Sequence, residues 1–246
     1  MKLSAVLIAY NEEANIQECL GSAAFADEIV LVDSGSTDRT LERAGRYSPH
    51  IFRNPFKDFA SQKNFALARA SGDWVFFIDA DERVPEALAR EIRELANVSG
   101  PDRVYAVKRL TYFFAKRLRF SGTQDDYPVR LFPRGKVHFE QPVHERVVTT
   151  LPVRKLKNAL VHKSTRDFDH YKQKLNQYIP LELEVMSVKK TRATFFDLFL
   201  RPAAKFFMLY IWKGGLLDGM AGLQYSLLSS YYDFLKYRKF LRLDCR

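Results

Sequence analysis

Apolar and polar positions alternate in a regular order along the first hundred residues. Short apolar runs typical of strands are each followed by a segment whose apolar residues recur with helical spacing. Because short connections join each strand to the next helix, this order predicts an α/β fold, a mostly parallel sheet covered by helices on both faces. The predicted strands are 3–9, 28–32, 50–53 and 74–78, and the predicted helices are 13–24, 39–47, 59–70 and 85–96.

The pattern changes after residue 100 to short strands separated by Pro, Gly and charged turns, and then to helices. The pair Gly214-Gly215 is expected to interrupt the helical part. We therefore predict a sheet-containing domain over residues 1–165 and a helical extension over residues 166–246. The predicted strands are 103–109, 128–132, 136–139 and 159–162, and the predicted helices are 167–186, 193–213 and 216–239.

Charge is unevenly divided between the two ends of the chain. Residues 1–100 carry 11 Lys/Arg and 16 Asp/Glu, whereas residues 101–246 carry 28 Lys/Arg and 13 Asp/Glu. An acidic front and a basic back indicate two tasks, with the basic part facing an anionic partner. Nucleic acid, anionic lipid headgroups and a phosphorylated acceptor are the three candidates.

Several classes of protein are not supported by the sequence. The two cysteines, Cys19 and Cys245, are not expected to form a disulfide, and no Cys/His spacing is typical of a zinc site. The start of the chain lacks the pattern of a signal peptide, and no uncharged apolar run is long enough to span a bilayer. We therefore expect no membrane-spanning helix and a cytoplasmic location.

Three polar clusters follow the first, second and fourth predicted strands, at residues 9–13, 33–38 and 79–82. In a parallel sheet these clusters meet at one edge, where open α/β sheets bind ligands. Asp79 and Asp81 are two apart on an extended chain, and two carboxylates on one side of a turn suit Mg²⁺ or Mn²⁺. The alternative is that this turn only caps the following helix.

The second cluster has a similar pair of interpretations. Ser36, Thr37 and Asp38 are suited to cap the next helix, which would give them a structural role. Asp33 lies too early in the chain for that cap, so we favour a ligand-binding role for it. Three acidic clusters at one edge would repel one another unless a positive group binds there.

These three clusters, in their order and spacing, resemble the motifs of glycosyltransferase family 2. The segments that carry the resemblance are Ala9-Tyr10-Asn11-Glu12, Val32-Asp33-Ser34-Gly35-Ser36-Thr37-Asp38 and Phe77-Ile78-Asp79-Ala80-Asp81-Glu82. The resemblance implies a GT-A fold, a nucleotide-diphosphate sugar as donor and Mg²⁺ or Mn²⁺ as cofactor. It implies that residues 1–100 bind the nucleotide sugar and residues 101–165 the acceptor.

The resemblance also implies roles for single residues. Asp33 would accept a hydrogen bond from the uracil ring of the donor, although Ser34 stands where many members have a second aspartate. Lys63 would approach the diphosphate, unless it is simply a solvated lysine on a helix face, and Asp81 would hold the metal. The remaining donor-binding residues would be Ala9, Tyr10, Asn11 and Glu12 around the nucleotide, with Asp79 and Ala80 near the ribose.

An inverting transfer needs a base to deprotonate the acceptor hydroxyl. A subgroup that acts on the lipopolysaccharide core is similar here, with an Asp shortly before Arg-Leu-Phe and then Val-His-Glu. This similarity implies Asp126 as the base, with Asp125 as the alternative and an exposed acidic turn as the structural interpretation. It further implies an acceptor-binding role for Arg130 and Glu145.

His144 is placed in the metal shell, and the alternative for this residue is a hydrogen-bonded packing role. His138 and His162 are expected to be packing residues rather than functional ones.

The back third mixes basic and aromatic residues, notably over 201–213 and 231–240. Such helices fit an interfacial position on an anionic leaflet, although a nucleic-acid surface or an ordinary packed helix pair would share this composition. The lipopolysaccharide subgroup is similar here too, through the segment Gly214 to Gly219.

The favoured interpretation is an inverting, metal-dependent glycosyltransferase that binds peripherally to the inner face of a bacterial inner membrane. It would move a sugar, with glucose preferred, from a UDP-sugar to a lipid-linked saccharide such as the lipopolysaccharide inner core. Transfer to a polyprenyl phosphate or a capsule precursor is the near alternative. A nucleotidyltransferase would need a Gly-rich loop where residues 10–13 stand, and a nucleic-acid-binding protein would be repelled by the acidic sheet edge, so no nucleic acid is expected. The sequence does not fix the donor sugar or the oligomeric state.

Overall fold

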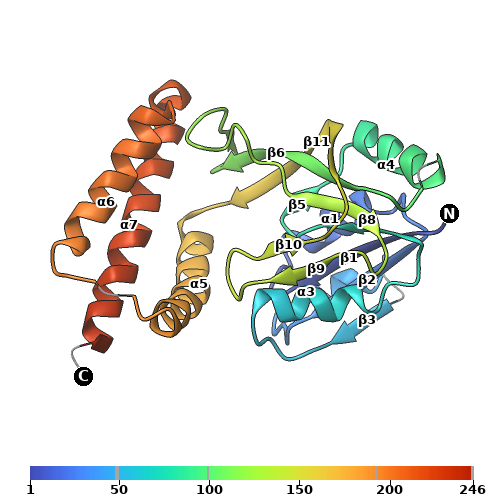
Figure 1. The fold of residues 1–246 in the computed structure, drawn as a ribbon, viewed down its shortest axis with the longest axis horizontal. Helices are drawn as coiled ribbons and strands as arrows, with labels where there is room; N and C mark the ends of the chain where they lie inside the picture. Colours follow the sequence, from blue (N-terminus) through green and yellow to red (C-terminus); the bar gives the residue numbers. More distant parts are fainter. Residues whose placement is uncertain (48–49, 99, 192, 245–246) are drawn as a thin grey trace. The chain divides into compact units, whose positions relative to one another are not determined.

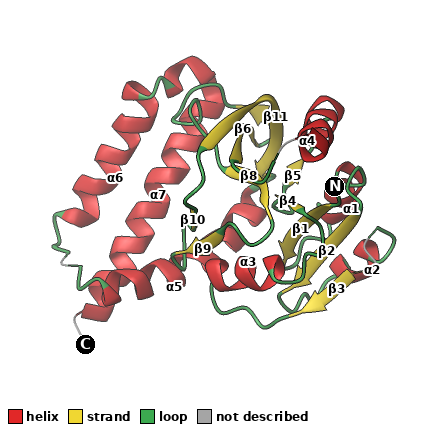
Figure 2. Cartoon of the chain, turned by 45° about the vertical axis from the view of Figure 1, so that its right-hand side comes forward, coloured by secondary structure: helices red, strands yellow, loops and turns green. Residues whose placement is uncertain are grey.

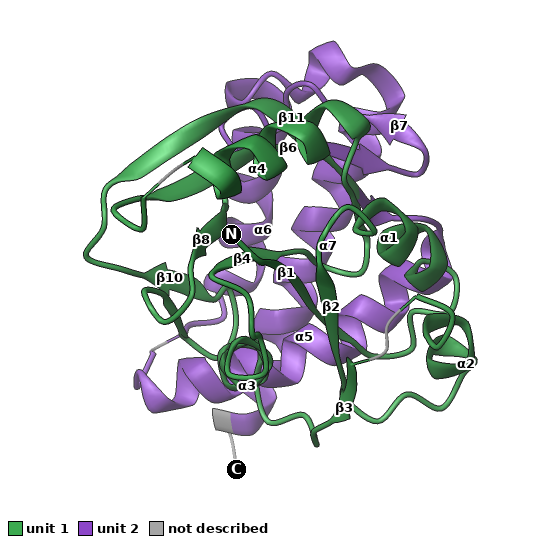
Figure 3. Cartoon of the chain, turned by 90° about the vertical axis from the view of Figure 1, so that its right-hand side faces the viewer, with its two compact units in different colours: residues 1–109, 127–162 green, residues 110–126, 163–246 purple. Residues whose placement is uncertain are grey.

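The computed structural model describes residues 1–47, 50–98, 100–191 and 193–244, so Cys245 lies outside the described residues. Its contacts divide the chain into two compact units (Figure 3). Unit 1 comprises residues 1–109 and 127–162, and unit 2 comprises residues 110–126 and 163–246. The segment 110–126 therefore groups with the C-terminal helices, although its first residues are the end of the strand Val104–Phe113.

The first half of the sheet in unit 1 is parallel, as the alternation of strands and helices predicts. The strands lie in the order β3-β2-β1-β4, and each neighbouring pair is parallel (Figure 2). Ala9 is the register partner of Asp33, so the first two strands end side by side. The bounds are β1 Leu3–Ala9, β2 Glu28–Asp33, β3 His50–Arg53 and β4 Trp74–Phe77.

The sheet continues beyond β4 in the order β8-β6-β11-β5, with antiparallel pairing of β4 with β8, β8 with β6, and β11 with β5. The bounds are β5 Glu82–Arg83, β6 Val104–Phe113, β8 Val129–Pro133 and β11 Val153–Thr165, while β7 Lys116–Arg117 pairs with β6. A separate antiparallel ribbon joins β9 His138–Glu140 to β10 Arg146–Val148. The short strands β5, β7 and β10 are not predicted from the sequence.

Helices cover both faces of the parallel half, because alternate residues of β1 and β4 point to opposite faces. One face packs on α1 and α4 through a core that includes Leu7, Leu20 and Ile92. The other face packs on α3 through a core that includes Val6 and Phe77. The bounds are α1 Ile16–Ser22, α2 Thr40–Ala44, α3 Phe59–Leu67 and α4 Glu86–Val98 (Figure 1).

A buried carboxylate ties the amino ends of the strands together. Glu28 accepts hydrogen bonds from the Ser4 hydroxyl at 2.5 Å, the Ser71 backbone N–H at 2.6 Å and the Lys2 ammonium at 3.0 Å. Burial raises the pKa of Glu28, but the hydrogen bonds from Ser4, Ser71 and Lys2 outweigh burial and lower it to about 2. A Cβ at Gly72 would lie 2.5 Å from the Ser4 hydroxyl, so this turn requires glycine.

Unit 2 is mostly helical. The carboxylate of Asp167 caps α5 by accepting from the His170 backbone N–H at 2.8 Å. Gly214, with a φ of 72°, ends the α6 segment, which confirms the predicted interruption. The bounds are α5 Phe168–Val188, α6 Asp197–Phe207, a π-helical turn η1 Met208–Trp212, a 3₁₀ turn η2 Gly215–Asp218 and α7 Gly219–Asp244. None of the helices in the described ranges is long and apolar enough to cross a membrane.

Candidate functional site

The loops that follow β1 and β2 are joined by an asparagine. Asn11 adopts a positive φ of 53°, its backbone N–H donates to the Ser36 hydroxyl at 2.9 Å, and its side-chain oxygen accepts from the Thr37 backbone N–H at 2.8 Å. These contacts confirm that the first two polar clusters meet at one sheet edge. The other residues predicted to bind the nucleotide sugar differ in exposure. Tyr10 is exposed and Glu12 is half-buried, whereas Ala9 and Ala80 are buried.

The aspartates of the second cluster organise their own loop. Asp33 is buried, and its carboxylate accepts from the backbone N–H groups of Gly35 at 3.0 Å and Ser36 at 3.1 Å. Asp38 accepts from the Thr40 backbone N–H at 2.9 Å, at the start of α2. Burial raises the pKa of Asp38, but its hydrogen bonds with Thr40 outweigh burial and hold that pKa below its ordinary value. The N-cap of α2 is Arg39, without a side-chain cap hydrogen bond, so Asp38 shapes the turn before the helix instead of being the predicted cap. Contact of Asp33 with a uracil ring stays a prediction.

Asp79, which follows β4, is surrounded by two buried cations. One carboxylate oxygen accepts from the Lys63 ammonium at 2.9 Å, and the other accepts from the Arg130 guanidinium. Burial raises the pKa of Asp79, but the positive charges of Arg130 and Lys63 outweigh burial and hold the pKa well below its ordinary value. Asp79 is therefore an anion engaged by two protein cations.

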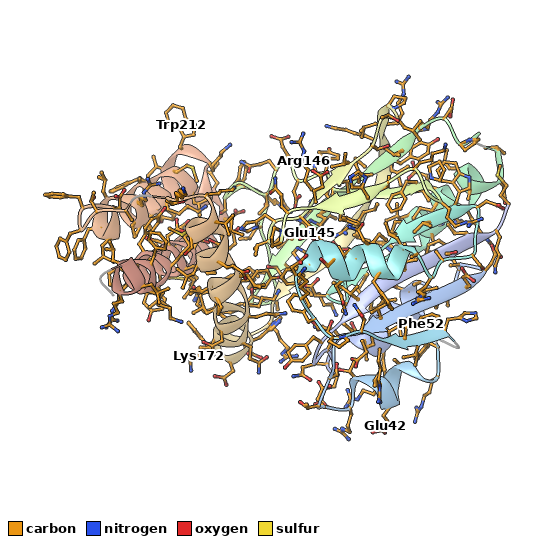
Figure 4. The ribbon with its side chains drawn as sticks, turned by 60° about the horizontal axis from the view of Figure 1, so that its bottom comes forward. Glu42, Phe52, Glu145, Arg146, Lys172 and Trp212 are labelled. Atoms are coloured by element: carbon orange, nitrogen blue, oxygen red, sulfur yellow. The ribbon has the colours of Figure 1, made fainter. Side chains whose placement is uncertain are left out.

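Lys63 lies on α3, and its side chain is only 3% exposed. Its ammonium donates to the carboxylates of Asp79 and Glu145 and lies 4.9 Å from the centre of the Phe77 ring and 5.4 Å from that of Phe139. Figure 4 shows Glu145 beside α3. The interpretation of Lys63 as a solvated helix-face lysine is therefore wrong, whereas its approach to a diphosphate stays a prediction.

Arg130 belongs to β8 and joins Asp79 to a second acid. Its guanidinium donates to Glu82 at 2.5 Å, Glu82 is fully buried, and the Glu82 carboxylate also accepts from the Asp79 backbone N–H at 2.9 Å. Burial raises the pKa of Glu82, although Arg130 counteracts this rise. Arg109 is more distant, 3.5 Å from Glu82. Arg130 thus contacts two carboxylates of the protein itself, and its binding to the acceptor stays a prediction.

Asp81 faces a histidine for which the sequence predicts only a packing role. Its carboxylate lies 3.4 Å from the His162 Nε2 atom, and both side chains are mostly shielded from solvent. The buried Nδ1 atom of His162 has no hydrogen-bond partner. Strand pairing causes this meeting, because β11 places His162 opposite Glu82, the residue after Asp81. No local sequence motif points to His162. Its position beside Asp81 depends on the register between β11 and β5, two strands that lie far apart in the sequence.

The donor set at this edge fits a cation that is shared with a ligand. Within the described ranges, no three His, Cys, Asp or Glu side chains are close enough together to hold a metal ion. Asp81 and His162 offer one carboxylate and one imidazole, and Mg²⁺ or Mn²⁺ is commonly bound by one or two protein groups together with phosphate oxygens. Asp81 and His162 are therefore the residues that would hold such a cation.

The other predicted residues are not brought to this pair by the described contacts. His144 is exposed and has a positive φ of 54°, in the turn between β9 and β10. Its role as a metal ligand stays a prediction. Asp125 and Asp126 are the last two residues of the segment 110–126 and belong to unit 2. Their role as the base likewise stays a prediction.

Comparison with known proteins identifies relatives of the chain. The family model described as Glycosyl transferase family 2 matches residues 4–158. The lipopolysaccharide core biosynthesis glycosyltransferase LpsC of Rhizobium meliloti (strain 1021) is 32% identical over 243 residues, which cover 96% of this chain and 90% of that protein.

Other matches are shorter. An uncharacterized glycosyltransferase of Rickettsia bellii (strain RML369-C) is 36% identical over 112 residues, which cover 44% of this chain and 38% of that protein. Among solved structures, the chain is similar to glucosyl-3-phosphoglycerate synthase from Mycobacterium tuberculosis, crystallised with Mn²⁺ and uridine-diphosphate-glucose. That match has a TM-score of 0.38 and 28% identity, and it covers 45% of this chain and 44% of that chain.

Proposed function

The chain belongs to glycosyltransferase family 2, and from that membership we propose that it transfers a sugar from a UDP-sugar to a lipid-linked saccharide of the lipopolysaccharide core. The chain is a glycosyltransferase, and its helix-covered mixed sheet, which is parallel from β3 to β4, is of the GT-A type. Glucose as the sugar and inversion at the anomeric carbon are part of the proposal.

One observation carries the choice of acceptor. Similarity to a lipopolysaccharide core biosynthesis glycosyltransferase extends over 96% of this chain, so it includes unit 2 as well as the sheet. A relative that matched only residues 1–100 would support the class of sugar donor and would say nothing about the acceptor. Similarity through the helices of unit 2 supports a shared acceptor class, because those helices lie outside the matched family model.

The charges at the sheet edge support a division of roles. Asp81 and His162 would hold Mg²⁺ or Mn²⁺, which when bound neutralises charge on the departing diphosphate. Asp79 is already engaged by Lys63 and Arg130, so we assign it a place beside the ribose. The base is Asp126, with Asp125 as the alternative, acting on the acceptor hydroxyl.

The location that fits this reaction is the inner face of the bacterial inner membrane, with the protein bound peripherally. The basic excess of unit 2 supports attraction to an anionic leaflet. A lipid-linked acceptor would be presented at that surface.

The test is a screen of nucleotide sugars by thermal shift, with and without Mn²⁺, because a ligand that binds only the folded state raises its apparent stability. We expect UDP-glucose to give the largest shift, and only with Mn²⁺. Transfer of labelled glucose to purified lipopolysaccharide inner core should follow, and Asp81→Asn should abolish the Mn²⁺-dependent shift. A shift with a different nucleotide base, or an unchanged Mn²⁺-dependent shift in Asp81→Asn, would contradict the proposal.

A further inference from the structure

Helix α6 has two apolar faces, and only one of them is packed. Leu198 and Pro202 of α6 and Leu209 of the following turn η1 are buried, and the Pro202 carbonyl accepts from the Ser230 hydroxyl of α7 at 2.6 Å. Phe196, Leu200 and Phe207 follow the spacing that brings residues to one common face of a helix, and all three are mostly exposed.

The exposed apolar surface continues into the turn after α6. Phe207, Met208, Ile211 and Trp212 together line a shallow apolar hollow. Trp212 is 85% exposed and projects away from the ribbon in Figure 4. Leu217, in the following 3₁₀ turn, is also exposed. The resulting surface, here called the α6 face, consists of Phe196, Leu200, Phe207, Ile211, Trp212 and Leu217.

Basic residues of unit 2 border the turn. The Asp218 carboxylate accepts from the backbone N–H groups of Arg119 at 2.8 Å and Phe120 at 3.0 Å, which fixes the 116–122 loop beside η2. That loop exposes Lys116, Arg117 and Arg119 to solvent. Lys213 is also exposed, directly after Trp212. The α6 face therefore ends next to a group of cations.

We propose that the α6 face inserts into the interfacial layer of an anionic bilayer, with α6 lying in the membrane plane. Exposed apolar patches that continue along a helix mark interaction sites. This proposal deepens the proposed function, because it states how unit 2 meets the membrane that carries a lipid-linked acceptor.

The charge of unit 2 argues for lipid rather than a second copy of the chain. The sequence of unit 2 holds 18 Lys/Arg and 10 Asp/Glu, a net charge of +8. Two copies meeting through this face would bring like charges together, whereas an anionic leaflet attracts them.

Tryptophan fluorescence tests the proposal directly, because the chain has two tryptophans and the other, Trp74, is fully buried in the sheet. In Trp74→Phe, emission reports Trp212 alone. We expect a blue shift, and quenching by brominated phosphatidylcholine, on adding vesicles of roughly two parts phosphatidylcholine to one part anionic phosphatidylglycerol. Flotation of the wild-type chain with the same vesicles gives a second measurement should Trp74→Phe fail to fold.

The matched comparison is between two pairs of substitutions. Phe207→Ser with Trp212→Ser should lower vesicle affinity by at least about tenfold, given the apolar area removed from the bilayer. Val98→Ser with Val188→Ser removes side chains that are 80% and 77% exposed elsewhere and should leave affinity unchanged. Equal losses in both pairs, or no vesicle binding by the wild-type chain, would overturn the proposal.

Two further outcomes separate the possible failures. A blue shift of Trp212 that depends on protein concentration without vesicles, together with elution as a dimer, would show that a second copy covers the face and would overturn the proposal. Thermal shifts with UDP-glucose and Mn²⁺ need no vesicles, so they test the proposed function independently. If the chain binds vesicles but shows no thermal shift with UDP-glucose and Mn²⁺, membrane insertion of the α6 face is supported and UDP-glucose as the donor is rejected.

Discussion

Replacing Arg130 by Met should strongly destabilise unit 1, because Arg130 is the cation shared by the fully buried Glu82 and the partly buried Asp79. Its side chain is 4% exposed, and it contacts the carboxylates of Asp79 and Glu82. Met keeps much of the volume and removes the charge. The variant would leave Glu82, which is fully buried, with the more distant Arg109 in place of its close cation.

The expected loss is about 3–5 kcal/mol in the free energy of unfolding, the usual cost of leaving one partner of a buried ion pair uncompensated. Arg109→Met is the matched control. Arg109 lies 3.5 Å from Glu82 and its side chain is 24% exposed, so this substitution should cost about 1 kcal/mol or less.

The loss should also depend on pH. The pKa of Asp79 is lowered in the folded state, chiefly because Arg130 and Lys63 overcome the effect of burial. Its ionisation therefore adds stability above the unfolded pKa of about 4, and that stability is lost as pH falls toward the folded value. Since Arg130→Met removes much of this contribution, the variant should differ most from wild type at neutral pH and less below about pH 4.

The assay is urea unfolding followed by tryptophan fluorescence in a Trp212→Phe background. Emission then comes from Trp74 alone, which is buried and belongs to unit 1, as Arg130 does. Adding Glu82→Gln to Arg130→Met should recover part of the stability, since one of the stranded charges is removed. A loss below about 1 kcal/mol for Arg130→Met, or one equal to that of Arg109→Met, would refute the reasoning about the buried network.

Three other sites give predictions of their own. Glu28→Gln should lower the free energy of unfolding by about 1–3 kcal/mol at pH 7. The urea midpoint should fall accordingly. Because the pKa of Glu28 is lowered to about 2, this deficit should shrink as pH falls from about 4.5 toward 2, as measured by urea titrations across that range. His162→Gln should raise the Mn²⁺ concentration for half-maximal donor hydrolysis by about ten- to a hundredfold. His144→Gln should change this Mn²⁺ concentration less than His162→Gln does. A larger change for His144→Gln would identify His144 as the metal ligand in place of His162. Asp126→Asn should reduce sugar transfer by about a hundredfold or more while the donor-induced thermal shift stays intact. Asp125→Asn should leave both transfer and the thermal shift unchanged.

The parallel half of the sheet could be predicted from the sequence because its information is local. Each apolar run of β1, β2 and β4 is buried on both faces, so it reads as a continuous hydrophobic segment. The helices between these strands fix the direction of each crossover, and that direction brings the three polar clusters to one edge. The predicted helix 13–24 begins late, at Ile16, after a turn in which the Glu12 carbonyl accepts from the backbone N–H groups of Asn15 and Ile16.

The contacts that define the site could not be predicted in the same way. Strand β5 has only two residues, Glu82 and Arg83, and it exists because β11 pairs with it. The same pairing delivers His162 to Asp81, and periodicity carries no information on pairing between distant segments. The burial of Lys63 depends on Glu145 and on the ring of Phe139, both of which come from a distant part of the chain.

The charges at this edge support the proposal that a diphosphate bound there would need an added cation. Lys63 and Arg130 are the two deeply buried cations of the network, and each already contacts two carboxylates, drawn from Asp79, Glu82 and Glu145. These three carboxylates already outnumber the two cations, and Asp81 adds a fourth, so a further anion such as a diphosphate would be repelled. A divalent cation held by Asp81 and His162 would offset that excess of negative charge. The protein cations thus hold the acidic turn in place, and under the proposed function a bound metal would carry the charge that faces the donor.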